Sequence, residues 1–203
     1  TEIYTLSLHD ALPISARFNT GIYHGKLGMW VFLASEIMFF SGFFGAFIVL
    51  RNLNLEVFTA GAHQLDKVVA TINTAVLITS SLTMALSHLA LERGHEGKFR
   101  LFLGLTIIGA FGFLGIKTYE YMTKFGHDIY PWTDTFFATY FTMTGFHALH
   151  VIGGLIPMIW MLGKSLTKGY PREMHHRVET LGLYWHFVDL VWIFLFPTLY
   201  LIF

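Results

Sequence analysis

The chain has 203 residues, of which 54% are hydrophobic and only 13% are charged, and its mean hydropathy is +0.56. This composition is too apolar for an ordinary soluble domain and is typical of a polytopic membrane protein. The formal net charge is zero, so nothing points to nucleic acid as a partner, and the lack of cysteine excludes disulfides, thiolate metal sites and iron–sulfur clusters.

The first fifteen residues, TEIYTLSLHDALPIS, differ in character from the rest of the chain. They contain neither the basic segment nor the apolar segment of a signal peptide, and the string resembles translated sequencing-adapter sequence. We therefore expect residues 1–15 to be non-native and residues 16–203 to form a single membrane domain.

Five later stretches are long and apolar enough to form helices of about 20 residues, the length that crosses a bilayer. Short polar segments separate them, so the sequence predicts an all-α bundle of five transmembrane helices. The predicted spans are Lys26–Leu50, Val68–Leu91, Arg100–Thr123, Thr135–Leu162 and Val178–Phe203.

Basic residues are distributed unequally between the two ends of these spans. Because cytoplasmic loops of membrane proteins are enriched in Lys and Arg, the richer side predicts a cytoplasmic N-terminus and a C-terminus outside. Nine basic residues lie on the N-terminal side, namely Arg17, Lys26, Arg93, Lys98, Arg100, Lys164, Lys168, Arg172 and Arg177, and three lie opposite, namely Arg51, Lys67 and Lys124.

The last predicted span carries ionisable residues on one helical face, namely Glu179, His186 and Asp189. Ionisable side chains within hydrocarbon are costly and usually face protein. We expect these three side chains to form a polar seam against the third and fourth spans. In the third span, Lys117 and Glu120 are three residues apart and are expected to pair and to extend toward the membrane interface.

Glu36 lies about 16 Å into the first span on an aromatic face, where burial favours the protonated carboxyl. It is either a proton-active or lipid-contacting carboxyl, or a structural hydrogen-bond donor between helices. His147 and His150 share a face of the fourth span, and haem or metal ligation is one interpretation. Too few histidines lie within the spans for a haem–copper core or a dihaem bundle, so we favour hydrogen bonding and expect no metal and no catalytic residue here.

Taken together and in this order, several motifs resemble the third subunit of haem–copper respiratory oxidases. The similarity covers about Gly25 to Phe203. The motifs are Gly28-Met-Trp with Ser35-Glu36, Asn73-Thr with Thr79-Ser-Ser81, Lys117 with Glu120-Tyr121, the run from Thr144 to Gly153, and Glu179 followed by the run from Tyr184 to Trp192.

The resemblance implies an accessory subunit without a redox centre, in the inner membrane of a bacterium. Such a subunit packs against the catalytic subunit I, and subunits II and IV are further expected partners. Haem and copper are held by the partner subunits. The accessory subunit binds phospholipid and supports proton uptake and durability of the enzyme. By this resemblance Glu36 is the buried, proton-related carboxyl. The polar groups expected near lipid headgroups or helix junctions are His147, His150, Lys164, Glu179, His186 and Asp189.

One departure from the family pattern is the helix count, since the familiar form has seven helices in bundles of two and five. The two-helix bundle is either absent from this lineage or lost from the gene sequence. Alternatives for function also stay open: subunit III of a quinol oxidase, the related protein that accompanies nitric oxide reductase, or a histidine-bearing transporter or haem protein. The chain itself does not identify the electron donor.

Overall fold

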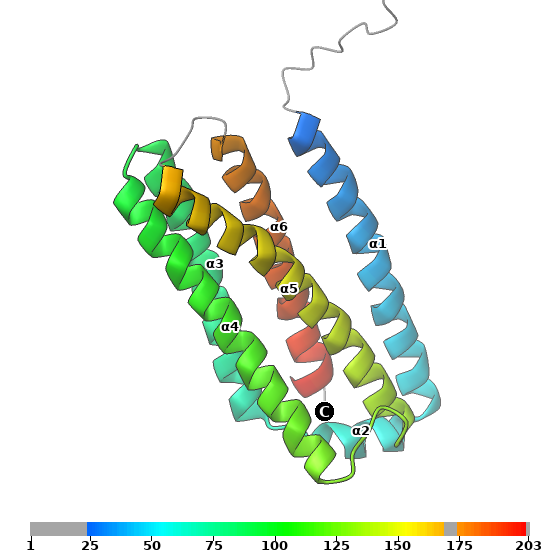
Figure 1. The fold of residues 1–203 in the computed structure, drawn as a ribbon. Coiled ribbons are helices and arrows are strands. Elements are labelled where there is room, and N and C mark those ends of the chain that lie inside the picture. The colour runs from blue at the N-terminus through cyan, green and yellow to red at the C-terminus, as the bar shows by residue number, and fades with distance from the viewer. Residues whose placement is uncertain (1–23, 169–173, 202–203) are drawn as a thin grey trace, which may run out of the picture.

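The computed structural model describes residues 24–168 and 174–201, which are helical apart from short turns. Five of the described helices are long and apolar enough to cross a membrane, so the five predicted spans are confirmed. The expectations for residues 1–15 lie outside the described residues. The helices are α1 (His24–Leu53), α2 (Leu55–His63), α3 (Lys67–Glu92), α4 (Glu96–Gly126), α5 (Thr135–Lys168) and α6 (Met174–Phe196), which continues into a π-helical turn, Pro197–Leu201 (Figure 1).

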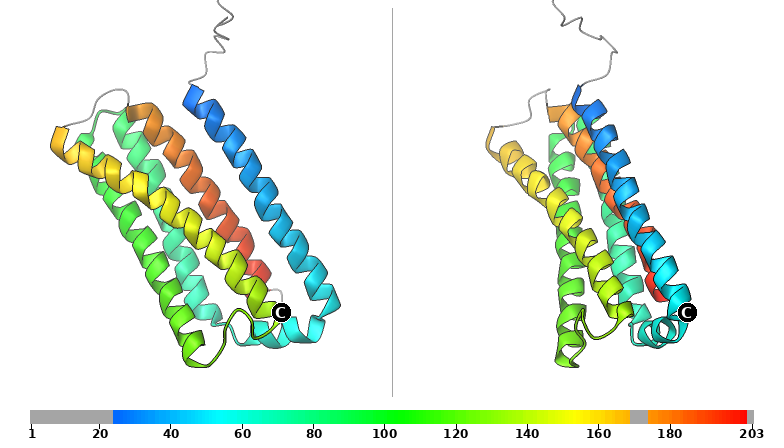
Figure 2. Two further views of the ribbon diagram at one scale, coloured as in Figure 1. Left: turned by 45° about the vertical axis from the view of Figure 1, so that its right-hand side comes forward. Right: turned by 90° about the vertical axis from the view of Figure 1, so that its right-hand side faces the viewer.

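The five long helices run roughly side by side, and α6 lies between α1 and α3 (Figures 1 and 2). Helices α3 and α4 form a closely packed hairpin, and α5 packs against both α4 and α6. By contrast, α1 contacts the rest of the bundle mainly through α5, α6 and the short α2. The first helix is therefore a peripheral element attached to the two last helices of the chain.

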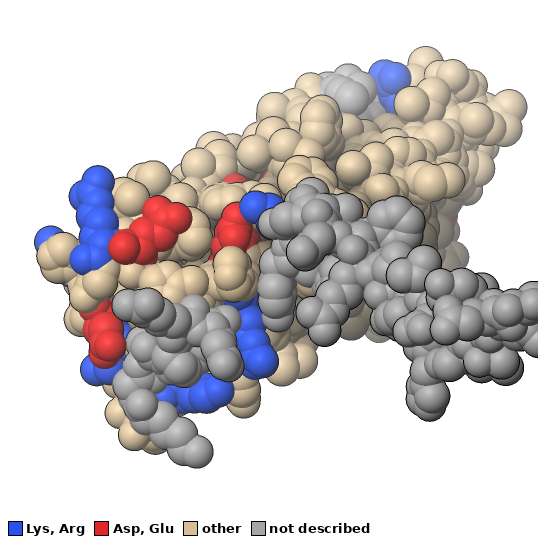
Figure 3. Space-filling model, turned by 90° about the horizontal axis from the view of Figure 1, so that it is seen from above, with Lys and Arg blue, Asp and Glu red and all other residues tan. Residues whose placement is uncertain are grey.

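The starts of α1 and α6, the α3–α4 turn and the end of α5 lie at one end of the bundle, and α2 and the π-helical turn lie at the other (Figures 1 and 2). Figure 3 looks onto the first end and shows Lys and Arg gathered there, with Asp and Glu beside them. The arrangement therefore agrees with the sequence-based division of basic residues between two ends, while the direction of the bundle across the membrane stays a prediction.

Local sequence explains where α3 and α5 begin. The Asp66 carboxylate accepts hydrogen bonds from the backbone N–H groups of Val68 (2.9 Å) and Val69 (3.1 Å), and thereby caps α3. In the same way, Asp134 accepts from the N–H of Phe137 at 2.8 Å at the start of α5. These caps satisfy N–H groups that have no partner within the helix.

Helix α2 was not predicted from the sequence. Its nine residues are too few to cross a membrane, but Phe58 and Ala62 on one face are fully buried. The Phe58 ring meets Phe47 and Phe136 edge-on, at centroid distances of 5.3 and 5.5 Å. Helix α2 therefore connects the end of α1 to the start of α5 through an aromatic contact.

Candidate functional site

Glu36 and His150 form a hydrogen bond between α1 and α5, with 2.9 Å between Oε2 and Nε2. The other ring nitrogen of His150, Nδ1, lies 2.7 Å from the carbonyl oxygen of Phe146, which can only accept a hydrogen bond. Nδ1 therefore carries a proton. The contact then requires one further proton, held either by the Glu36 carboxyl or by the His150 Nε2. The pair can move that proton between its two members without changing its net charge.

This pair lies in a groove of about 440 Å³ between α1 and α5. Aromatic side chains line most of it, and both members of the pair keep about one-sixth of their side-chain area exposed, 17% for Glu36 and 16% for His150. Tyr184 of α6 closes one side, and its hydroxyl donates to the His150 carbonyl at 2.9 Å. The pair is thus reachable from the outer surface of the bundle.

Lys117 and Glu120 of α4 form a buried ion pair at 2.9 Å, with side-chain exposures of 5% and 7%. The Lys117 ammonium donates to the hydroxyls of Tyr200 (2.7 Å) and Tyr140 (3.2 Å). Both hydroxyls in turn donate to Glu120 Oε1 at 2.8 Å. The predicted pairing is confirmed. The expectation that these side chains extend to the interface is wrong, because two tyrosines from α5 and the C-terminal turn supply partners inside the protein.

His147 is fully buried, and neither of its ring nitrogens has a hydrogen-bond partner among the described residues. Its ring instead packs against Phe113 and Trp192, at centroid distances of 5.4 and 5.0 Å. The expected hydrogen bonding is therefore confirmed for His150 but wrong for His147, which behaves here as an aromatic core residue.

The polar residues of α6 do not contact the helices that were expected to pack against them. At the basic end of the bundle, Glu179 pairs with Lys26 of α1 through Oε1 and Nζ. Nearer the middle of the span, His186 Nδ1 lies 2.7 Å from the hydroxyl of Ser81 on α3. Asp189 is buried, with 5% of its area exposed, and also interacts with Ser81. The seam therefore joins α6 to α1 and α3. The expectation that it packs against the third and fourth predicted spans, which are α4 and α5, is wrong.

Lys164 lies near the end of α5, at the basic end of the bundle. Its ammonium lies 5.0 Å from the centre of the Trp160 ring, and the Arg177 guanidinium lies 5.8 Å from the same ring. A tryptophan beside two cations is typical of the membrane–water interface, which agrees with the expected location of Lys164.

In the described part of the chain, no three His, Asp or Glu side chains converge as metal ligands would. Several members of the polar clusters were not predicted from the sequence, above all the hydrogen-bonding roles of Tyr140, Tyr184 and Tyr200. The available signal was the tyrosine itself, since a buried hydroxyl usually finds a hydrogen-bond partner. Spacing along one helix did not identify which helix would supply it.

Comparison with known proteins assigns these motifs to one family. The family described as "Cytochrome c oxidase subunit III" matches residues 14–202. A cytochrome c oxidase subunit 3 of Thermostichus vulcanus is 35% identical over 177 residues, covering 87% of this chain and 86% of the relative. The subunit 3 of Bacillus subtilis is 34% identical over 182 residues, covering 86% and 84%. A cytochrome bo(3) ubiquinol oxidase subunit 3 of Pseudomonas aeruginosa is 29% identical over 174 residues, covering 86% and 83%. The chain belongs to the cytochrome c oxidase subunit III family.

Proposed function

We propose that this chain is the accessory subunit of a proton-pumping cytochrome c oxidase, that it packs on the catalytic subunit, and that it supports turnover without carrying a redox centre. Its family is a component of multi-subunit respiratory oxidases, and haem and copper then belong to the partner subunits. The single observation that carries the mechanistic part is the Glu36–His150 pair, which opens onto a groove of about 440 Å³ at the outer surface of the bundle.

The geometry of this pair suits proton exchange with the surroundings rather than redox chemistry. One proton lies between a carboxyl and an imidazole at 2.9 Å, and the pair is partly exposed. Neither group changes oxidation state in such an exchange. The pair therefore supports proton uptake without taking part in electron transfer. If the pair is lost, the catalytic subunit still reduces oxygen.

Phospholipid is the proposed occupant of the groove beside this pair. Aromatic and aliphatic side chains such as Phe39 and Leu149 line it, and these suit an acyl chain. At the basic end of the bundle, the Lys164 ammonium beside Trp160 suits a headgroup phosphate. We also propose a bacterial inner membrane, with the basic end of the bundle cytoplasmic and the C-terminus outside, and subunits II and IV as further partners.

Two substitutions at one position test the role of Glu36 in the assembled oxidase. Glu36→Gln retains an N–H donor for His150 Nε2, so we expect oxygen reduction and assembly close to wild type. Glu36→Leu leaves that nitrogen without a partner, so we expect normal initial turnover but faster inactivation during sustained turnover. Ser35→Ala is the matched control, because the Ser35 hydroxyl donates to the Phe32 carbonyl of its own helix, at 2.6 Å.

The measurement is oxygen consumption followed from the first turnovers until activity is lost. If Glu36→Gln abolishes turnover in a fully assembled complex, Glu36 belongs to an obligatory proton path and the accessory role is wrong.

A quinol oxidase is the second candidate setting for the same subunit. The observation that favours it is the 29% identity to the Pseudomonas aeruginosa ubiquinol oxidase subunit 3 over most of both chains. Purifying the complex through this subunit and measuring oxidation of reduced cytochrome c against that of a quinol distinguishes the two donors.

A further inference from the structure

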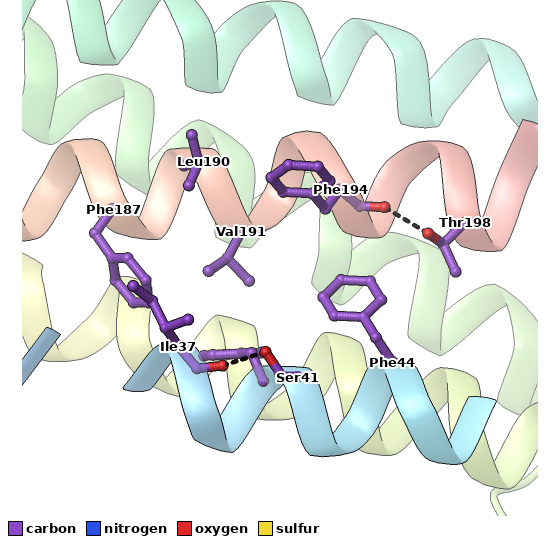
Figure 4. Close-up of a pocket in the computed structure, with 9 residues that line it drawn as sticks. Ile37, Ser41, Phe44, Phe187, Leu190, Val191, Phe194 and Thr198 are labelled. Carbon is purple, nitrogen blue, oxygen red and sulfur yellow. Dashed lines mark hydrogen bonds between the residues drawn. The ribbon is translucent and has the colours of Figure 1, made fainter. Parts of the chain in front are cut away.

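Two pockets between α1 and α6 hollow the outer surface that α1, α6 and α3 form, and this surface is called the α1–α6–α3 trough below. Figure 4 looks onto this surface and shows α6 running between α1 and α3, with side chains of α1 and α6 lining a pocket between them. That pocket has a volume of about 220 Å³, and a neighbouring pocket of about 320 Å³ lies between the same two helices. The exposed apolar side chains on this surface include Ile37, Ile78, Leu82, Leu190, Ile193 and Phe194.

His186 is exposed on this surface near the middle of the membrane. It lies eleven residues into the span that begins at His175, which places it about 16 Å deep at 1.5 Å per residue. That depth is close to the centre of a hydrocarbon core of about 30 Å. Its Nδ1 is satisfied by Ser81, but its Nε2 makes no hydrogen bond with the part of the chain that the structure describes.

Other exposed polar side chains within the spans are satisfied by their own helices. The hydroxyls of Ser41 and Thr79 bond the carbonyls four residues earlier, at 2.6 and 2.8 Å. Such hydroxyls can face acyl chains at little cost. The His186 imidazole is not satisfied in this way, because its Nδ1 lies 2.7 Å from the side-chain hydroxyl of Ser81 on α3 and its Nε2 has no hydrogen-bond partner among the described residues.

The outer face of α5 has the opposite character. Its exposed side chains near the middle of the span include Leu149, Ile152, Ile156 and Ile159, which are aliphatic. A face of this kind has no hydrogen-bonding requirement and suits lipid. The contrast between α5 and α6 therefore indicates that the two sides of the bundle meet different surroundings.

We propose that the α1–α6–α3 trough is the docking surface for a transmembrane helix of another oxidase subunit, and that this helix carries a hydrogen-bonding side chain opposite His186 Nε2. An acyl chain offers no hydrogen-bonding group to the imidazole. A partner helix offers both an apolar face for the trough and a polar group for the imidazole. The proposal rests on the proposed function, since it names the surface by which this chain packs in the complex.

Site-directed photo-crosslinking tests the surface directly, because the chain has no cysteine of its own. Leu190→Cys places a probe in the trough, and Ile152→Cys places a control at matched depth on α5, since each lies fifteen residues from the cytoplasmic end of its span. The side chains are similarly exposed, 49% and 42%. Each variant is labelled with a benzophenone maleimide in membranes that contain the assembled oxidase, irradiated, and analysed by mass spectrometry.

We expect the Leu190 probe to crosslink to another oxidase subunit and the Ile152 probe to crosslink to lipid. If the Leu190 probe gives only lipid adducts while the chain still co-purifies with the oxidase, the docking surface is wrong but the proposed function stands. If the unmodified chain does not co-purify with an oxidase at all, the proposed function fails instead.

Substitutions at the imidazole provide a second measurement. We expect His186→Leu to reduce retention of the chain in the complex during a detergent wash by about threefold to twentyfold, the range measured for single interhelical hydrogen bonds in membranes. His186→Gln, which can still donate and accept, is expected to restore part of that retention. Ser81→Ala removes contacts within the chain, to His186 and Asp189, and is expected to have a smaller effect on retention. Equal losses for Ser81→Ala and His186→Leu, or no loss for His186→Leu, would overturn the proposal.

Discussion

Replacing Lys117 with methionine removes the positive charge from the buried cluster of Lys117, Glu120, Tyr140 and Tyr200. Methionine preserves most of the side-chain volume, so the change isolates the charge and its three hydrogen bonds, to Glu120, Tyr140 and Tyr200. Removing one partner of a buried ion pair typically costs about 3–5 kcal/mol, because the other charge is left uncompensated. Both tyrosine hydroxyls still donate to Glu120, so we expect about 3 kcal/mol.

The double variant Lys117→Met with Glu120→Gln removes both charges and is expected to cost less than Lys117→Met alone, about 1–2 kcal/mol. Unfolding of the purified chain in mixed micelles of graded SDS content, followed by circular dichroism, measures all four members of the double-mutant cycle. The reasoning predicts a coupling energy of at least about 1 kcal/mol. Additive effects of the two single variants, within about 0.5 kcal/mol, would refute it.

Three further predictions concern packing, orientation and metal content. Gly154→Ala is expected to destabilise the chain by about 1 kcal/mol, because a Cβ there would lie 3.0 Å from two aromatic rings of α6. Gly163→Ala is the control. Its Cβ would have open space around it, so the free energy of unfolding in the same SDS titration should not change. A membrane-impermeant maleimide added to intact cells is expected to label Trp132→Cys but not Lys98→Cys, and the reverse pattern would contradict the predicted orientation. Elemental analysis of the purified chain is expected to find no stoichiometric haem iron, copper or zinc; about one metal per chain would disprove this.

Sequence alone predicted the transmembrane helices but not the contacts between them. Hydropathy is a local property of about 20 residues, so the spans could be read directly, and the structure extends them by a few residues at their ends. Helix α2 was missed because nine amphipathic residues beside Asn54 look like a polar loop when no partner for Phe58 is visible. Its burial depends on Phe136, which lies far away in the sequence.

The sequence identified most of the polar residues of the candidate site but few of the pairs that they form. Periodicity identifies which face a residue occupies, so Glu36, His150 and His186 were recognised as polar groups within spans. It does not identify the neighbouring helix, and the Glu36–His150 pair joins residues 114 positions apart. His147 shows the reverse error, since its residue type indicated hydrogen bonding but the structure surrounds it with aromatic rings.

The attachment of α1 to the last two helices has a consequence for biosynthesis. Helix α1 is made before α5 and α6, and its polar partners follow 114 residues later, in the case of Glu36, and 153 residues later, in the case of Lys26. At translation rates of about 5–20 residues per second, roughly 6–23 s pass between the synthesis of Glu36 and that of His150. During that interval α3 and α4, which are adjacent in the chain, can already pack as a hairpin. A nascent chain that stalls before α5 therefore exposes an unpaired carboxyl within the membrane, which is a feature that quality-control proteases of the membrane can recognise.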